Sequence, residues 1–202
     1  MDTRQPTASR ARGRRGLSVR ARARGVRLIL MDVDGVLTDG RIYYLPDGGR
    51  KSAEGAPAVM ETKTFHSRDG LGIRLAHDAG LKTGIISGRA SPVVEYRARE
   101  LGMHFLRQNA RHKLGPYREI LKESGLRDRE ICFIGDDLVD LPILLRAGLA
   151  VGVSGGHPLL RSRVHYVTRA PGGLGAVREA IELILAAQGK FKAVLDGFTA
   201  KD

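Results

Sequence analysis

Short apolar runs alternate with longer segments of helical periodicity along residues 26–188. The apolar runs predict strands at residues 28–31, 82–86, 104–106, 131–134, 149–151 and 165–167. Apolar residues with helical spacing predict helices at residues 69–79, 91–101, 111–124, 137–147 and 174–188. Strands that alternate with helices of about ten to fifteen residues are typical of βαβ units. We therefore predict an α/β fold, with a doubly wound parallel sheet covered by helices on both faces.

Residues 41–66 interrupt this alternation. Two β-like segments, at about 41–45 and 60–66, are separated by a stretch rich in proline and glycine. Such residues form the turns of β-hairpins, so we predict a hairpin flap that projects from the end of the first strand. No other insertion exceeds about a dozen residues, which is too short for a cap domain of its own. We expect the reaction site to be covered by another segment or left open.

Positive charge is concentrated near the start of the chain. Residues 1–25 hold eight arginines and one acidic residue, which contribute +7 of the net charge of +12. A segment with so few large apolar residues cannot bury enough surface to order itself, so we predict a disordered tail at 1–25. A nucleic-acid-binding arm, an organellar transit peptide and a dispensable extension are all compatible with this composition. We favour the extension, because the segment has no clear amphipathic stripe.

The rest of the composition indicates in which compartment the protein is expected. No apolar run approaches the roughly 20 residues that cross a bilayer, so we expect a soluble protein without a membrane partner. The single cysteine, Cys132, lies within an apolar run and excludes a disulfide framework within one chain. A lone core cysteine suits a reducing compartment, and we predict a cytoplasmic protein.

Two carboxylates mark the end of the first predicted strand. Asp32 and Asp34 are spaced i, i+2, so their side chains point to the same side where the strand becomes a loop. Two acids at one strand end repel each other unless a cation lies between them, and a hard divalent cation such as Mg²⁺ prefers oxygen ligands. An isolated pair of this kind could equally be a solvated loop start, so its meaning depends on the other strand ends.

Two further strand ends bring related side chains to the same edge of the sheet. Ligands of open α/β sheets bind beyond the carboxyl ends of the strands. Ser87-Gly88-Arg89 follows the second predicted strand of this sheet, where a hydroxyl and helix-start amides can hold phosphate oxygens. Lys113 stands at the start of a helix, where a cation opposes the helix dipole unless it faces an anion. Taken singly, these residues also fit a helix cap and a solvated lysine.

A third strand end carries acids. Asp136 and Asp137 follow the run 131–134, and Asp140 lies on the turn that begins the next helix. Asp136 or Asp137 could complete a metal site with Asp32, while the other caps the helix and anchors neighbouring loops.

These motifs together resemble a known superfamily. The set Asp32-x-Asp34-Gly35-Val36, Ser87-Gly88-Arg89, Lys113 and Gly135-Asp136-Asp137-x-x-Asp140 is similar in order and spacing to the four motifs of the haloacid dehalogenase (HAD) superfamily. Residues 32–40, 68–70, 135–142, 157–159 and 166–179 resemble more narrowly the 3-deoxy-D-manno-octulosonate 8-phosphate phosphatases. The resemblance extends from about Val26 to Lys190 and implies a HAD-like phosphatase domain at 26–188.

The resemblance implies the following chemistry. Asp32 is the nucleophile that forms an aspartyl-phosphate, and Asp34 protonates the leaving sugar oxygen and then activates water. Mg²⁺ is bound by the Asp32 side chain, the Asp34 carbonyl and Asp136.

Other residues then bind the substrate or support the site. The resemblance implies that Ser87 and Lys113 hold the transferring oxygens while Asp137 and Asp140 have supporting roles. Arg68, Arg89 and Arg178 are candidates for the substrate carboxylate or phosphate, because guanidinium groups match planar oxyanions. Arg178 could also be a solvated residue of a helix face.

The resemblance also implies an assembly. Members of this family lack a cap and form homotetramers, in which the flap builds a small barrel and a neighbour's C-terminal tail helps to close the site. We assign residues 189–202 to such a tail, with a frayed terminus as the alternative. Residues 50–59 lengthen the flap beyond the family pattern, and the arginine-rich tail is an addition to it.

The leading prediction is therefore a Mg²⁺-dependent phosphatase of an eight-carbon sugar-acid phosphate, in the synthesis of the lipopolysaccharide inner core. A phosphatase of a nine-carbon, sialic-acid-type 9-phosphate would use the same chemistry. A nucleic-acid-associated protein with a basic tail has no use for Asp32 and Asp34 together. A regulatory pseudo-enzyme fused to a nucleotidyltransferase would need a longer chain.

Overall fold

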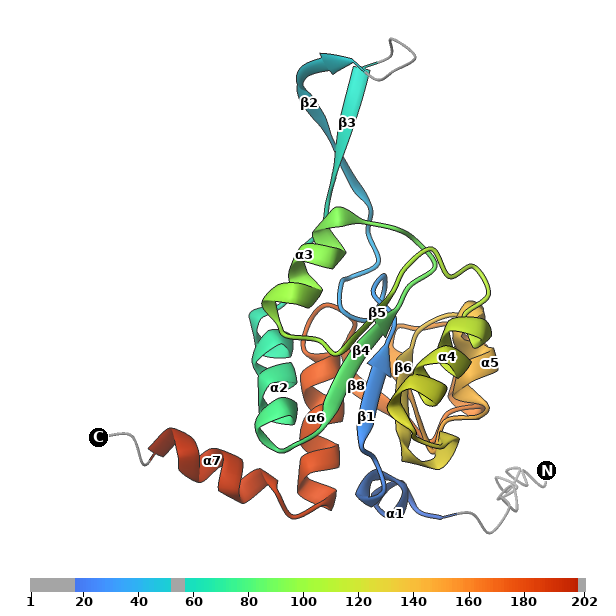
Figure 1. Ribbon diagram of the computed structural model, residues 1–202, viewed down its shortest axis with the longest axis vertical. Coiled ribbons are helices and arrows are strands. Elements are labelled where there is room, and N and C mark those ends of the chain that lie inside the picture. The colour runs from blue at the N-terminus through green and yellow to red at the C-terminus, as the bar shows by residue number, and fades with distance from the viewer. Residues whose placement is uncertain (1–16, 52–56, 200–202) are drawn as a thin grey trace, which may run out of the picture.

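The structure is a computed structural model that describes residues 17–51 and 57–199. In these residues, a six-stranded parallel sheet forms the centre of the molecule in the order β5-β4-β1-β6-β7-β8 (Figure 1). Its strands are β1 (Leu28–Met31), β4 (Lys82–Ile86), β5 (Phe105–Arg107), β6 (Ile131–Gly135), β7 (Leu149–Ser154) and β8 (Tyr166–Pro171). Each lies at a predicted strand, and the predicted fold class is confirmed.

Helices cover both faces of the sheet (Figure 1). One face is packed by α1 (Val19–Arg24), α2 (Ser67–Asp78), α3 (Pro92–Glu100) and α6 (Ala176–Ala187), and the other by α4 (Leu114–Ser124) and α5 (Leu141–Leu144). Short 3₁₀ turns occur at η1 (Asp128–Glu130), η2 (Leu138–Asp140) and η3 (Pro158–Ser162). In β1, Ile29 and Met31 belong to one core and Leu28 and Leu30 to the other, as side-chain alternation along a strand requires.

Helix α1 corrects the prediction of a tail that is disordered through residue 25. Its first turn is capped by Ser18, whose Oγ accepts a hydrogen bond from the Ala21 amide. Arg22 Nη1 donates to the Gly148 carbonyl at 2.9 Å, and the Gln188 side chain donates to the carbonyls of Ala23 and Val26 at 3.2 and 2.8 Å. The composition gave no sign of these tertiary contacts. Residues 1–16 of the predicted tail lie outside the described residues.

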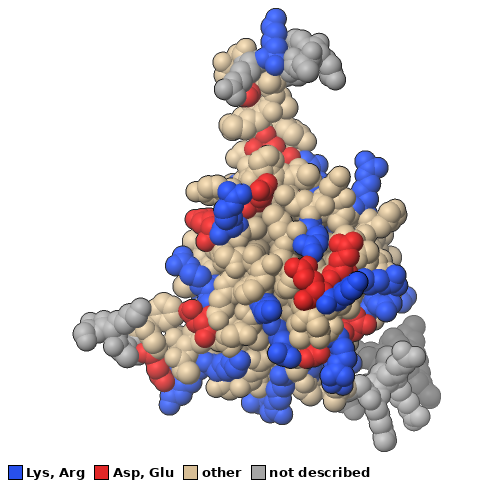
Figure 2. Space-filling view, in the orientation of Figure 1, with Lys and Arg blue, Asp and Glu red and all other residues tan. Residues whose placement is uncertain are grey.

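The predicted flap is present as an antiparallel hairpin of β2 (Tyr43–Lys51) and β3 (Pro57–Thr62). It rises from the body at the end of the molecule where the chain leaves β1 (Figure 1). The space-filling view shows the flap as a narrow column that stands clear of the body (Figure 2). Residues 52–56 of the segment that lengthens the flap are not among the described residues.

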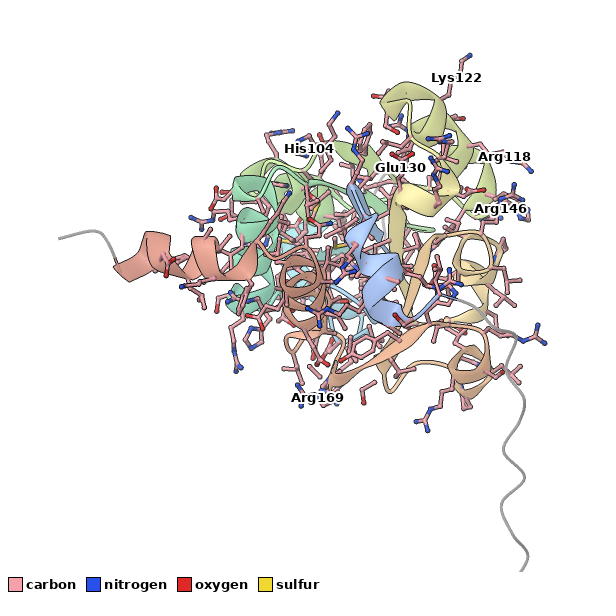
Figure 3. All side chains as sticks on the ribbon, turned by 90° about the horizontal axis from the view of Figure 1, so that it is seen from below. His104, Arg118, Lys122, Glu130, Arg146 and Arg169 are labelled. Atoms are coloured by element: carbon pink, nitrogen blue, oxygen red, sulfur yellow. The ribbon has the colours of Figure 1, made fainter. Side chains whose placement is uncertain are left out.

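The predicted C-terminal tail contains a helix, α7 (Phe191–Thr199), that leads away from the body (Figures 1 and 3). Its apolar residues Phe191, Val194, Leu195 and Phe198 have helical spacing, and Phe191 and Val194 pack against the core. Residues 200–202 are outside the description. None of the helices in the described ranges is both long enough and apolar enough to cross a bilayer.

A buried carboxylate joins α2 to the start of α6. Asp69 accepts hydrogen bonds from the amides of Gly175 and Arg178 at 3.1 and 2.8 Å, so it serves as the N-terminal cap that α6 lacks in its own sequence. The loop before α6 in turn supports the loop after β1, because the Gly173 amide donates to the Val36 carbonyl at 2.9 Å. Asp69 therefore stabilises the backbone on which Asp32 and Asp34 lie.

We predict that Asp69→Ala lowers the free energy of unfolding by about 1–3 kcal/mol, because it leaves two helix-start amides without an acceptor. Urea unfolding monitored by circular dichroism measures this change. Asp78→Ala, at the exposed other end of the same helix, is the control and should change stability by no more than about 0.5 kcal/mol. Equal effects of the two substitutions would contradict the capping role of Asp69.

Candidate active site

The carboxyl ends of β1, β4 and β6 meet at one cavity of about 380 Å³. It is lined by Asp32, Asp34, Ser87, Gly88, Arg89, Ala110, Arg111, Lys113, Asp136, Asp137 and Val139. The three strand ends identified in the sequence therefore contribute to a single site, as the parallel sheet requires. Larger cavities of the described structure lie elsewhere, but none of them combines carboxylates from several strand ends.

Lys113 is the cation at the centre of this site. Its Nζ lies 2.6 Å from Asp32 Oδ2 and 2.7 Å from Asp140 Oδ1, and its side chain is buried. Burial lowers the pKa of Lys113, but Asp140 and Asp32 outweigh it and hold the pKa above its usual value. Lys113 is therefore a charged group shared by two carboxylates, which explains a lysine at the start of α4.

Asp32 and Asp140 differ in what else they bind. Asp32 Oδ1 accepts a hydrogen bond from the Val33 amide at 2.7 Å. Asp140 Oδ2 accepts from the amides of Asp136 and Asp137 at 3.0 and 3.4 Å, and the residue is fully buried. One Asp140 oxygen thus holds the loop after β6, and the other binds Lys113. This geometry suits the supporting role predicted for Asp140.

Asp136 lies against the loop after β1. A Cβ at Gly35 would lie 2.0 Å from Asp136 Oδ2, and Gly35 also has a φ of +87°, so only glycine allows this approach. Burial and the carboxylates of Asp140, Asp32 and Asp137 raise the pKa of Asp136 to about 7. Burial and Asp140 also raise the pKa of Asp32, to about 6.

The donor set fits a divalent cation. Carboxylate oxygens of Asp32, Asp136 and Asp140 lie within 4.8 Å of one another, and Lys113 alone does not offset their charge. Asp140 is fully buried and does not line the cavity, whereas Asp32 and Asp136 do, so Asp32 and Asp136 are the side chains best placed to bind the ion. Hard oxygen donors of this kind match Mg²⁺.

Ser87 lines the cavity and is held by backbone hydrogen bonds on both sides of its peptide unit. Its amide donates to the Arg107 carbonyl at 2.9 Å, and its carbonyl accepts from the Ala110 amide at 2.9 Å. The neighbouring Asn109 adopts a φ of +56°, a conformation that asparagine tolerates better than most residues. These contacts fasten the Ser87 loop to the segment that leads to Lys113, so that the two predicted phosphate-binding residues lie in one cavity.

The structure adds two residues that sequence reasoning missed. Lys63, just after β3, forms an ion pair with Asp34 and lies 3.1 Å from Glu61 Oε1. Glu61 Oε2 accepts a hydrogen bond from Arg89 Nη2 at 2.7 Å, and Arg89 Nε is 3.7 Å from Asp34 Oδ2. The signal in the sequence was an acid and a base spaced i, i+2 at the foot of the flap, which places both side chains on one side of the strand.

The other predicted site residues have mixed outcomes. Asp137 lines the cavity mouth, is exposed, and accepts a hydrogen bond from the Leu138 amide at 2.7 Å as a helix cap. Arg68 is exposed at the start of α2 and does not line the cavity. Arg178 is also absent from the lining and pairs with Glu182, one helical turn away, at 2.5 Å. Of the three predicted substrate-binding arginines, only Arg89 reaches the site in the described residues.

Comparisons with known proteins agree with this geometry. Residues 68–148 match the family model of haloacid dehalogenase-like hydrolases. The chain is 42% identical over 172 residues to a 3-deoxy-D-manno-octulosonate 8-phosphate phosphatase of Escherichia coli, which covers 85% of this chain and 86% of that protein.

Two solved structures are similar in fold and sequence. The phosphatase of the same name from Yersinia pestis has a TM-score of 0.77 and 42% identity, over 86% of this chain and 88% of that chain. The phosphatase from Moraxella catarrhalis, solved in complex with a magnesium ion, a phosphate ion and a KDO molecule, has a TM-score of 0.80 and 38% identity, over 89% and 97% of the two chains. This chain therefore belongs to the family of 3-deoxy-D-manno-octulosonate 8-phosphate phosphatases, in the haloacid dehalogenase superfamily.

Proposed function

We propose that this protein is a Mg²⁺-dependent phosphatase that removes phosphate from 3-deoxy-D-manno-octulosonate 8-phosphate, in the synthesis of the lipopolysaccharide inner core. One observation carries the proposal: a buried aspartate bound to a buried lysine shares a cavity with a second aspartate, a serine and a further carboxylate. The family relationship supports the substrate and favours the eight-carbon acid over a nine-carbon one.

Asp32 is placed to act as the nucleophile. The Val33 amide and the Lys113 ammonium fix its carboxylate at the end of β1, so little reorganisation is needed before attack. An Asp32 oxygen attacks phosphorus, the bond between phosphorus and the sugar oxygen breaks, and an aspartyl-phosphate forms. Ser87 and Lys113, which line the same cavity, hold the oxygens of the transferring group.

Asp34 moves the protons. It gives a proton to the sugar oxygen as that oxygen leaves, so that the product departs as an alcohol. It then takes a proton from a water molecule that attacks phosphorus, which releases inorganic phosphate and regenerates Asp32. Lys63 and Arg89 border the two oxygens of the Asp34 carboxylate and fix its place beside the cavity.

Asp32, Asp136 and the Asp34 carbonyl would hold Mg²⁺, while Asp137 and Asp140 support the loop after β6. When bound, the ion offsets charge between the nucleophile and the phosphate group. Arg89 is the substrate-binding candidate that the geometry favours, because its guanidinium lines the cavity and is 40% exposed. A guanidinium at this position can bind the carboxylate of a sugar acid. The lone buried Cys132 supports a cytoplasmic location.

We propose further that the protein assembles as a homotetramer through its flap. Val59 and Met60 are 61% and 51% exposed on β3, next to exposed Tyr44 and Leu45 on β2. Uncharged side chains cover most of the middle of the flap (Figure 2). A projecting apolar hairpin of this kind is typical of a surface that is covered by another chain. Phe198 of α7, which is also exposed, gives the C-terminal tail an apolar contact for a neighbour.

The test of the proposed activity is phosphate release from a panel of esters. We expect the octulosonate 8-phosphate to exceed a sialic-acid 9-phosphate and hexose phosphates by about a hundredfold in kcat/KM, which is about 2.7 kcal/mol of transition-state binding. EDTA should abolish the release of phosphate and Mg²⁺ should restore it, because without the ion the negative charges of the carboxylates in the site are not compensated. A flat profile would contradict the substrate, and activity that resists chelation would contradict the metal.

We predict that Asp32→Asn reduces kcat to background, because an amide cannot form the aspartyl-phosphate. Steady-state assays and circular dichroism measure activity and folding together. Asp78→Asn, at an exposed position remote from the cavity, is the control and should match the wild type. Substantial residual turnover by the folded Asp32 variant would refute the role of the nucleophile.

We predict that the double substitution Val59→Lys and Met60→Lys converts the tetramer into smaller species, because paired flaps would then bring like charges together. Light scattering coupled to size-exclusion chromatography gives the mass of each variant. Leu145→Lys places a charge on an equally exposed apolar residue of the body and should leave the mass unchanged. An unchanged mass for the flap variant would argue against assembly through the flap.

A further inference from the structure

Lys63 is a buried cation at the foot of the flap. It follows β3 directly, and only 1% of its side chain is exposed. Its Nζ forms an ion pair with Asp34 Oδ1 and lies 3.1 Å from Glu61 Oε1. A buried ammonium is costly unless its partners are in place, so Lys63, Asp34 and Glu61 favour one shared arrangement.

Arg89 closes a ring of alternating charges with these residues. Its Nη2 binds Glu61 Oε2 at 2.7 Å, and its Nε lies 3.7 Å from Asp34 Oδ2. The two cations of the ring face different surroundings. Arg89 lines the cavity and is 40% exposed, whereas Lys63 lies behind Asp34 and does not line the cavity. An anion in the cavity therefore meets Arg89 and not Lys63.

This placement limits what Lys63 can do. Because it does not line the cavity, we expect Lys63 to act on the reaction through Asp34 and not by contact with the phosphate. Its ammonium does contact the carboxylate that transfers the protons in the proposed reaction. Any contribution of Lys63 to the rate must then pass through the orientation of Asp34.

We propose that Lys63 is the positioning residue of Asp34, and that the flap, through Lys63 and Glu61, sets the geometry of proton transfer to the leaving group. The inference rests on the proposed function, since it needs Asp34 as the proton donor. It gives the hairpin a role within each active site, besides any role in assembly. Glu61 supports this role because it holds Lys63 and Arg89 at the same time.

The leaving group separates this role from a structural one. A sugar alkoxide needs a proton as it leaves, but p-nitrophenolate is a stable anion and leaves without one. Loss of a group that orients the proton donor should therefore slow cleavage of the sugar-acid phosphate and spare cleavage of p-nitrophenyl phosphate. General damage to the cavity would slow both reactions alike.

The experiment compares single-turnover rates of the two esters in full-length wild-type and variant proteins with Mg²⁺. Single-turnover conditions isolate cleavage of the ester from hydrolysis of the aspartyl-phosphate. For Lys63→Met, which keeps the length of the side chain, we expect a loss of at least about tenfold on the octulosonate 8-phosphate and less than about threefold on p-nitrophenyl phosphate. In steady state, kcat should fall while KM stays within about threefold.

Two further variants complete the test. Lys51→Gln removes an exposed lysine from the same flap and should leave both rates unchanged. Glu61→Gln leaves Lys63 in place but removes the negative charge that Lys63 shares with Arg89, and its kcat should show a smaller loss with the same preference for the sugar-acid phosphate. It serves as the readout if Lys63→Met does not fold.

Equal losses on the two esters, or a rise in KM with unchanged kcat, would overturn the positioning role. If the wild type leaves the octulosonate 8-phosphate intact but cleaves another alkyl phosphate, the proposed substrate fails. In that case the rates of Lys63→Met and the wild type are compared on that alkyl phosphate and on p-nitrophenyl phosphate. A selective loss on the alkyl phosphate then supports the positioning role, and equal losses on both esters overturn it.

Discussion

The site depends on the ammonium of Lys113, which lies between the carboxylates of Asp32 and Asp140 at 2.6 and 2.7 Å. The contact joins the end of β1, the start of α4 and the loop after β6. Breaking a buried ion pair by removing one partner costs about 3–5 kcal/mol, because the other charge stays buried without compensation. The three segments therefore keep a common arrangement, and Asp32, the proposed nucleophile, is oriented before a substrate arrives.

A second buried lysine, Lys63, lies beside Asp34, the other aspartate of the proposed reaction. Lys113 contacts Asp32 from α4, and Lys63 contacts Asp34 from the foot of the flap. Both lysine side chains are almost completely buried, so neither charge is screened by water. The two aspartates, two residues apart on one loop, are thus held by cations from different parts of the fold, which allows them distinct roles.

The remaining negative charge explains the need for a metal ion. Among the ion pairs of the described residues none involves Asp136, and burial together with its acidic neighbours raises its pKa although Lys113 opposes them. Gly35 brings this carboxylate against the loop that carries Asp34. The charge balance therefore favours a divalent cation at the same point where a phosphate group would enter.

The sequence was sufficient for the sheet and for much of the cavity lining, because the β-like runs at 28–31, 82–86 and 131–134 lead into polar residues and parallel strands bring these ends together. Asp32, Ser87 and Asp136 were found in this way. Arg178, a candidate for the substrate anion or a residue of a helix face, does not line the cavity and pairs with Glu182 one turn along the same helix, so its role in substrate binding stays a prediction. Helix α1 was missed because its stability comes from distant carbonyls, such as that of Gly148. Lys63 was missed because the flap was predicted to project from the body and to serve in assembly, so its foot was not considered as part of the site.

The central claim is that Asp32 carries the phosphate group during the reaction. Acid quenching of a single turnover with labelled octulosonate 8-phosphate, followed by borohydride reduction and peptide mapping, tests it directly. The account predicts that the label appears on the protein and that reduction converts residue 32 to homoserine. Quenched protein without label, or label at another residue, would contradict it.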